Sequence, residues 1–191
     1  SLFSSLMGNG TTSISKDDFN EEVDYLGASI YFGSESAYAN TLSEFFPRIM
    51  ELMADAIKNP LLTQEEFDKE KDKLIEGLKS QEKDVSAVSS RMRSALIFGK
   101  NHPQGEFTTE EKVKALKLND VKKFYDNFYN PKNAYLVVVG DVKFKDVEKL
   151  VNTHLGDWKD KVVPSATYSD PKDVQYTQIN FIDMPNAVQS E

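Results

Sequence analysis

Residues 129–141 read Tyr-Asn-Pro-Lys-Asn-Ala-Tyr-Leu-Val-Val-Val-Gly-Asp, and this stretch decides the fold class. Its central run, Tyr135–Val139, is apolar without interruption, and Gly140-Asp141 ends it. A short, continuous apolar run bounded by turn residues is typical of a strand whose two faces are both covered. The sequence therefore predicts that Tyr135–Val139 is a strand at the centre of a sheet.

Helical periodicity surrounds this run. Apolar side chains recur three and four residues apart, and Ser15 and Thr63 stand where helix caps are expected. These patterns predict helices over residues 1–7, 15–26, 45–57, 63–83, 85–98, 109–116, 118–128 and 145–154. Patterns typical of strands predict a hairpin of residues 29–32 with 37–42, and a last strand over 178–183. The predicted fold class is α+β, an antiparallel-rich mixed sheet packed against helices.

The composition excludes some classes of protein and argues against certain partners and locations for this chain. With 191 residues, 39% of them hydrophobic, the chain can bury a substantial core. Its formal net charge of -8, without a basic stripe, makes nucleic acid a poor candidate partner. No apolar run approaches the ~20 residues that a membrane-spanning helix needs. The absence of cysteine excludes disulfides and thiolate ligands but fits either redox compartment. Because the sequence opens in mid-pattern, its start does not give the compartment, and a periplasmic or other extracytoplasmic location is only a working assumption.

Familiar catalytic patterns are missing from the sequence. His102 and His154 are its only histidines, and no Gly-x-Ser-x-Gly elbow is present. His102 lies in a Pro-Gly loop and His154 at the end of a predicted helix, so we assign both to structural roles. The acidic pairs Glu21-Glu22 and Glu65-Glu66 fall in first or exposed helical turns, where carboxylates serve capping and solubility. The residues alone therefore indicate no catalytic group.

Several stretches taken together resemble the pitrilysin and insulinase family of zinc peptidases. The likeness rests on their order and separation over residues 1–158, and residues 184–190 are similar to the start of that family's second lobe. The stretches are Leu2-Phe3-Ser4-Ser5-Leu6-Met7-Gly8-Asn9-Gly10-Thr11, Leu26-Gly27-Ala28-Ser29, Asn59-Pro60-Leu61-Leu62, Phe67-Asp68-Lys69-Glu70-Lys71, His102-Pro103-Gln104-Gly105, and residues 124–141.

The resemblance implies where a zinc site would stand. Active relatives carry His-x-x-Glu-His on a helix that ends a few residues before a Gly-Thr pair, and a distant Glu completes the coordination. Counting back from Gly10-Thr11 puts Ser1 and Ser5 at the histidine positions and Ser4 at the position of the catalytic base. Counting forward from Asn59-Pro60 puts Gly77 at the distal Glu position, and a shift of one residue would put Glu76 there instead. We therefore expect no catalytic residue, no metal site and no cofactor in this chain.

The resemblance also implies a division of the chain. Residues 1–158 would form a pitrilysin/insulinase-type lobe that lacks its first strands, 159–175 a linker and 176–191 the start of a second lobe. The Arg and Tyr that hold the substrate carbonyl in active relatives belong to positions beyond Glu191. Because peptides often pair with a sheet edge in this family, the predicted strand Ser29, Ile30, Tyr31, Phe32 is the candidate peptide-binding element. An ordinary buried hairpin is the competing interpretation.

Three functions remain open on this basis. The first is a noncatalytic lobe that shapes a peptide-binding chamber, with a zinc-bearing peptidase subunit or second lobe as its partner and peptide as its substrate. The second is a purely structural assembly subunit, like the family's respiratory core proteins. The third is the degenerate half of a full-length zinc metalloendopeptidase whose active motif lies outside these residues.

Overall fold

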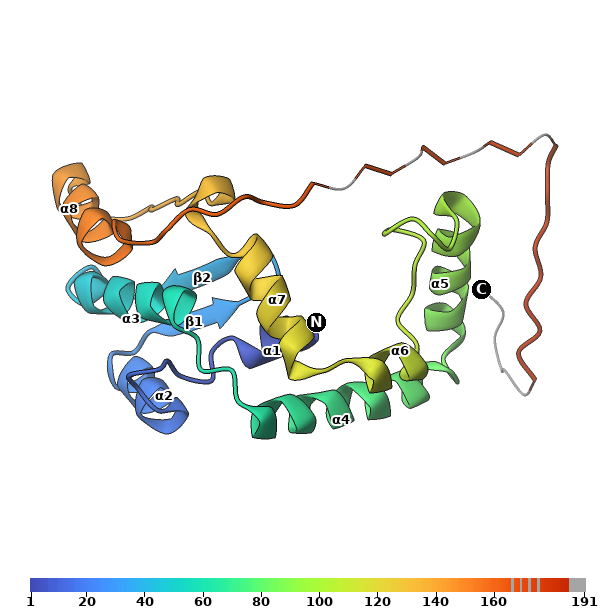
Figure 1. Cartoon of the computed structure of the whole chain (residues 1–191), viewed down its shortest axis with the longest axis horizontal. Coiled ribbons are helices and arrows are strands. Elements are labelled where there is room, and N and C mark those ends of the chain that lie inside the picture. Colours follow the sequence, from blue (N-terminus) through green and yellow to red (C-terminus); the bar gives the residue numbers. More distant parts are fainter. Residues whose placement is uncertain (166, 169, 172, 175, 186–191) are drawn as a thin grey trace. The chain divides into compact units, whose positions relative to one another are not determined.

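The computed structural model describes residues 1–185 apart from 166, 169, 172 and 175. The chain divides into two compact units. Unit 1 consists of Ser1–Glu70 and Lys117–Pro164, and unit 2 begins with Lys71–Leu116 and resumes at Ser165. Figure 1 labels the elements in chain order. Their bounds are α1 Leu2–Leu6, α2 Lys16–Tyr25, β1 Ser29–Phe32, β2 Ala37–Asn40, α3 Phe46–Lys58, α4 Gln64–Gln81, α5 Val85–Phe98, α6 Glu110–Ala115, α7 Leu118–Phe128, the 3-10 turn η1 Pro131–Asn133, and α8 Phe144–Leu155.

The predicted helices are confirmed, most of them to within two residues at each end. Local signals explain this agreement. The Ser15 hydroxyl accepts a hydrogen bond from the Asp18 N–H (3.2 Å), which caps α2 as its sequence predicts. Thr109 caps α6 in the same way through the N–H of Lys112 (3.3 Å). The starts of α2 and α6 are thus each stabilised by a capping residue next to the first turn.

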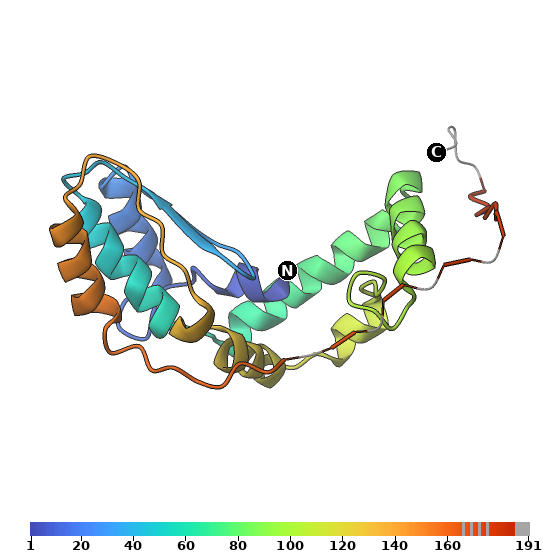
Figure 2. The same ribbon diagram turned by 90° about the horizontal axis from the view of Figure 1, so that it is seen from above.

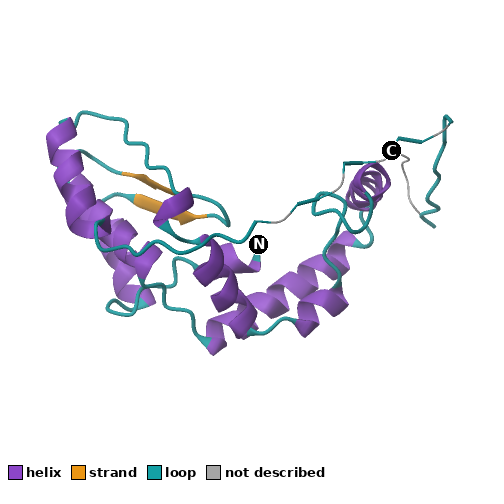
Figure 3. Ribbon diagram, turned by 45° about the horizontal axis from the view of Figure 1, so that its top comes forward, coloured by secondary structure: helices purple, strands orange, loops and turns teal. Residues whose placement is uncertain are grey.

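The hairpin supplies the sheet of unit 1. β1 and β2 pair antiparallel, with Ile30 opposite Ala39 and Tyr31 opposite Tyr38. Because side chains alternate across a strand, Ile30 and Ala39 turn toward the core while both tyrosines face outward, 65% and 62% exposed. Figure 3 shows the hairpin as the β structure of the described chain, and it is a two-stranded sheet.

Beneath the hairpin lies the core that gives unit 1 its shape. α2 contributes Phe19 and Val23, and α3 contributes Ile49, Leu52 and Ala56, all of them buried. α3 also packs against α8, as Figure 2 shows. The two strands and three helices form the α+β arrangement that the sequence predicts.

The turn after α1 is hydrogen-bonded to the turn after α3. Thr11 forms a β-bridge with Pro60, and the N–H of Thr12 donates to the carbonyl of Asn59 (2.9 Å). Gly10 has a φ of +85°, and a Cβ there would lie 2.6 Å from the Ile14 carbonyl oxygen, so only glycine fits. The Gly10-Thr11 and Asn59-Pro60 motifs therefore have a structural role in this chain.

Unit 2 is built on α5, α6 and the later part of α4. The Lys71 ammonium donates to the carbonyls of Lys114 and Leu116, each at 2.8 Å, which joins α4 to the end of α6. The Lys79 ammonium lies 3.6 Å from the Glu110 carboxylate. Across both units, none of the helices in the described part of the chain has the length and apolar character that crossing a membrane requires.

Two predicted strands are not formed. Residues 135–139 carry no strand pairing, and Tyr135, Val137 and Val139 are 97%, 80% and 92% exposed, so the prediction of a covered central strand is wrong for this structure. The predicted strand 178–183 is likewise unpaired. The physical reason is the same for both, since a strand exists only where a neighbouring strand accepts its backbone hydrogen bonds. No such neighbour lies beside either segment within the described residues.

Candidate functional site

The three serines at the motif positions lie at the start of unit 1. Ser1 stands at the N-cap position of the five-residue helix α1 without a side-chain capping bond, and Ser4 and Ser5 occupy the third and fourth positions of the helix. The hydroxyls of Ser4 and Ser5 both donate to the carbonyl oxygen of Ser1, at 2.7 and 3.3 Å. On the other side of the helix, Leu2, Phe3 and Leu6 are buried. α1 is therefore held by its apolar face, and two of its hydroxyls bond to its own backbone.

The donors at these positions do not fit a zinc ion. Zinc sites in proteins use imidazole, thiolate and carboxylate ligands. Neutral hydroxyls that already donate a hydrogen bond to a carbonyl are poor ligands for zinc. Gly77 contributes no side chain, and a Cβ built there would meet nothing within 4 Å. The described residues also contain no group of three or more His, Cys, Asp or Glu able to hold a metal ion. The chemistry of the donor set thus disagrees with the zinc site of active relatives.

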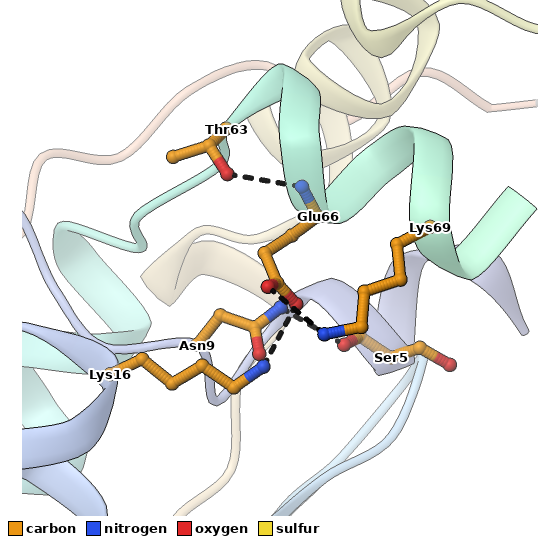
Figure 4. A network of polar contacts seen from close by, with 6 residues as sticks. All are labelled: Ser5, Asn9, Lys16, Thr63, Glu66 and Lys69. Carbon is orange, nitrogen blue, oxygen red and sulfur yellow. Dashed lines mark hydrogen bonds and ion pairs between the residues drawn. The ribbon is translucent and has the colours of Figure 1, made fainter.

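Close to Ser5, polar side chains of α2 and α4 gather around the carboxylate of Glu66 (Figure 4). The Lys16 ammonium donates to Glu66 Oε2 at 2.8 Å, and the Lys69 ammonium lies 3.6 Å from Oε1. The hydrogen bond from Lys16 is the main cause that holds the pKa of Glu66 below its ordinary value. The Asn9 side chain donates to the Ser5 carbonyl at 3.3 Å. This network holds one carboxylate between two ammonium groups.

The helix cap expected at Thr63 is formed at the start of α4. Thr63 Oγ1 accepts from the Glu66 N–H at 3.3 Å, as expected of a capping residue. The Glu66 carboxylate is engaged with Lys16 and Lys69 instead of returning to the Thr63 backbone. Sequence reasoning missed this ion pair because Lys16 and Glu66 are 50 residues apart in the chain.

The candidate peptide-binding strand lies on the hairpin. Ser29, Ile30 and Phe32 are partly buried, and Tyr31 is the member that turns its side chain to the outside. The Phe32 ring lies beside Gly8, where a Cβ would come within 3.3 Å of Cδ2. The end of β1 is therefore next to the end of α1, and the outer edge of β1 has no strand partner among the described residues.

A groove in unit 1 was not predicted from the sequence. It has a volume of about 1370 Å³ and lies between β2 on one side and residues 134–140 on the other. Its floor includes Ile49, Met50 and Met53 of α3, and Trp158 also lines it. The uninterrupted apolar run Tyr135–Val139 was the signal that could have located it.

His102 has local partners, and His154 lies at a helix end. His102 Nδ1 accepts a hydrogen bond from the Gln104 N–H (3.1 Å), and its ring stacks on Phe98 with centroids 5.3 Å apart. Tyr168 meets the same ring edge-on at 5.5 Å. His154 lies in the last turn of α8. His102 thus has the structural role expected for it, as the link that packs its loop onto α5.

Comparisons with known proteins agree with this fold. The family model described as "Insulinase (Peptidase family M16)" matches residues 2–109, more than half of the chain, and "Peptidase M16 inactive domain" matches residues 115–187. An uncharacterized zinc protease of Rickettsia felis is 28% identical over 75% of this chain and 35% of its own length. The mitochondrial cytochrome b-c1 complex subunit 1 of Rattus norvegicus is 25% identical over 83% of this chain and 35% of its own length.

A protease from Helicobacter pylori has a similar solved structure. The TM-score is 0.77 at 21% sequence identity, covering 90% of this chain and 44% of that one. The fold is therefore shared, and the chain spans about a third of the length of the two curated relatives. Since the insulinase model covers more than half of the sequence, this chain belongs to the insulinase family, peptidase family M16.

Proposed function

We propose that this chain is a noncatalytic peptidase-like lobe that shapes a peptide-binding chamber and acts with a zinc-bearing partner subunit or half. The observation that carries the proposal is the serine set of α1. Ser4 and Ser5 donate to the Ser1 carbonyl where active relatives place their base and second histidine. Metal-assisted hydrolysis needs a bound ion and a base beside it, and these hydroxyls supply neither.

The proposed role in peptide binding uses the outer edge of β1. An extended peptide that adds a strand to this edge would gain main-chain hydrogen bonds with little dependence on its sequence. Tyr31, 65% exposed, would contact the peptide through its ring. Sequence-tolerant binding of this kind suits a subunit that holds peptides while its partner cuts them.

Reconstitution with the zinc-bearing partner tests the proposal. Affinity purification from the native source, followed by metal analysis of the copurified chains, is expected to yield a zinc peptidase. Peptide cleavage is expected from the pair and not from this chain alone. Cleavage by the purified chain alone, or full activity of the partner without it, would contradict the proposal.

A matched pair of variants tests the peptide-binding edge. Tyr31→Ala is expected to weaken peptide binding by the reconstituted pair about 3- to 10-fold, the range for loss of one aromatic contact. Tyr25→Ala is the control, because Tyr25 lies at the end of α2 and is 88% exposed. Equal peptide affinities for the two variants would show that β1 is not part of the peptide-binding site.

The likeness to the rat cytochrome b-c1 subunit favours a second candidate, a structural assembly subunit. Copurification separates the two functions, since a membrane complex would support this alternative and a small zinc peptidase the first. The third possibility is the degenerate half of one long metalloendopeptidase, because the chain covers only 35% of the Rickettsia protein. A His-x-x-Glu-His pattern in adjoining sequence of the same polypeptide would establish that arrangement.

A further inference from the structure

We infer that Tyr129 is a positioning residue for the proposed peptide-binding edge of β1. By donating to the carbonyl of Gly33, its hydroxyl fixes the end of the strand with which an extended peptide would pair. The inference rests on the proposed function and adds to it a residue that acts through the hairpin turn instead of through the peptide.

The hydrogen bonds of the hairpin show which residues of β1 face the outer edge. The Gly33 N–H donates to the Ser36 carbonyl at 2.7 Å, so these two residues are a hydrogen-bonded pair that continues the register of β1 and β2. Bonded and non-bonded pairs alternate along an antiparallel ladder. Counting back from Gly33, Ile30 and Phe32 therefore direct their N–H and C=O groups toward the outer edge. An added peptide strand would bond to these two residues.

Tyr129 holds the chain immediately beyond the second of these residues. Its hydroxyl donates to the Gly33 carbonyl at 3.1 Å, and the two residues are 96 positions apart in the chain. Gly33 follows Phe32 directly, so the place of the Gly33 carbonyl constrains the neighbouring planar peptide unit, which carries the Phe32 carbonyl. This hydrogen bond thus constrains one of the acceptors that the edge would offer to a peptide.

A cluster of aromatic rings fixes the position of Tyr129 itself. Its ring meets the ring of Phe3 edge-on at 5.1 Å and lies 5.8 Å from that of Tyr125, both measured between centroids. Phe3 is buried, and its ring also lies 4.9 Å from that of Phe124. These contacts place Tyr129 against α1 and α7, which lie side by side in Figure 1. Because packed neighbours limit the rotamers of the ring, the hydroxyl has a defined place from which to donate.

The edge of β1 needs such support because a hairpin by itself is weakly ordered. A single two-stranded sheet is at best marginally stable in water. A peptide that binds to a mobile strand must also supply the free energy that orders the strand, whereas a strand held in place avoids this cost. Just before β1, the N–H of Ala28 donates to the Val23 carbonyl of α2 at 3.1 Å, which holds the other end of the strand. Tyr129 gives the turn end a corresponding attachment.

Tyr125 offers a matched comparison. It lies on α7 one helical turn before Tyr129, and its hydroxyl likewise donates to backbone carbonyls, those of Ile57 and Lys58. These carbonyls belong to α3 and not to the hairpin. Replacing either tyrosine by phenylalanine removes the hydroxyl and retains the ring, so the two variants differ in where the lost hydrogen bonds lead.

Amide hydrogen exchange and peptide binding test the inference on the full chain. In Tyr129→Phe, the amide of Gly33 is expected to exchange about 2- to 10-fold faster, the range for loss of one hydrogen bond. The probe for binding is a fluorescent peptide rich in Val and Thr, which favour the extended conformation. Its affinity, measured by fluorescence anisotropy, is expected to fall about 2-fold or more in Tyr129→Phe, because only the held conformation of β1 is competent to pair. Tyr125→Phe is expected to leave both quantities unchanged, although it lowers the stability of the fold.

Three outcomes would overturn the role of Tyr129 alone. An unchanged exchange rate at Gly33 in Tyr129→Phe would show that the hydroxyl does not hold the turn. Faster exchange with an unchanged affinity, or an equal loss of affinity in both variants, would show that the hydrogen bond has no role of its own in peptide binding. Failure of the unmodified chain to bind the peptide would contradict the proposed function itself, and this role with it.

Discussion

The Lys16 ammonium lies 2.8 Å from the Glu66 carboxylate, and this ion pair joins the first turn of α2 to the first turn of α4. Both side chains are partly buried, 38% and 18% exposed. Glu66 is also the residue whose N–H is capped by Thr63. One residue thus secures the start of α4 through its backbone and through its side chain.

This pair predicts a pH-dependent contribution to stability. The pKa of Glu66 is lowered from 4.5 in the folded state, so its stabilising effect is present above the unfolded pKa and is lost as the pH falls through the folded pKa. Glu66→Gln is expected to cost about 0.5–1 kcal/mol at pH 7, the range for a partly exposed pair. In urea unfolding, the difference should begin to shrink as the pH falls below the unfolded pKa and should vanish once the pH is below the lowered folded pKa, where both proteins carry a neutral side chain. Glu65→Gln is the control, because Glu65 is an exposed neighbour in the same turn. An equal loss of stability for both variants would show that the ion pair between Lys16 and Glu66 does not stabilise the fold.

Tyr125 of α7 predicts an effect at alkaline pH. Its hydroxyl donates to the carbonyls of Ile57 (2.9 Å) and Lys58 (2.6 Å) at the end of α3, and burial raises its pKa to about 12. Because the folded pKa lies above the unfolded value, stability from this group is present below about pH 10 and declines toward pH 12. Tyr125→Phe is expected to cost about 1–2 kcal/mol at pH 7 in chemical unfolding. It should also flatten the loss of stability above pH 10, and an unchanged alkaline profile would count against this role.

Alanine substitutions at Gly77 and Gly27 are expected to have opposite effects on stability. Gly77 lies inside α4 with open space at its Cβ position, so Gly77→Ala is expected to stabilise the chain by about 0.5–1 kcal/mol. Gly27 also has open space, but its φ of +58° is unfavourable for alanine, so Gly27→Ala is expected to destabilise. Thermal unfolding of both variants checks the pair. A destabilising Gly77→Ala would mean that this position is constrained by something other than helix propensity.

Two leucines test where the core lies. Leu52 of α3 is 1% exposed, and Leu52→Ala in residues 1–191 is expected to cost about 2–5 kcal/mol. Leu136 is 46% exposed, and Leu136→Ala in the same chain is expected to cost less than about 1 kcal/mol. The sequence pattern alone predicts a large loss at Leu136 as well. Similar losses at the two positions would show that residues 135–139 are already packed within this chain.

The helices could be predicted because their signals are local. α5 and α7 have the predicted bounds, since the cap at Asp84, the stop at Gly99 and the apolar spacing of α7 lie within or next to each helix. The hairpin was predictable for the same reason, because four residues join its strands.

The strand at residues 135–139 could not be predicted reliably, because pairing depends on partners far away in the sequence. Tyr135–Val139 has the composition of a central strand, but no described segment supplies its hydrogen bonds. The sequence identified an apolar segment in need of cover, and it gave no information on what covers it. The groove was missed because its walls, β2 and residues 134–140, are distant in the chain.

At the motif positions, too, the sequence predicted the location of the residues but not their contacts. Counting from Gly10-Thr11 located Ser1, Ser4 and Ser5 on a helix, and the structure has them in and just before α1. The bonds from Ser4 and Ser5 to the Ser1 carbonyl follow from side-chain rotamers, which the sequence does not specify. The peptide-binding role of Ser29–Phe32 stays a prediction.

Metal analysis of the purified chain tests the central claim most directly. After equilibration with a small excess of zinc and removal of the free ion, mass spectrometry under native conditions and elemental analysis give the zinc content per chain. The account predicts well below one tightly held zinc per chain, with the same value for Ser5→Ala and for Glu76→Ala. One zinc per chain in the unmodified protein, lost in either variant, would contradict it.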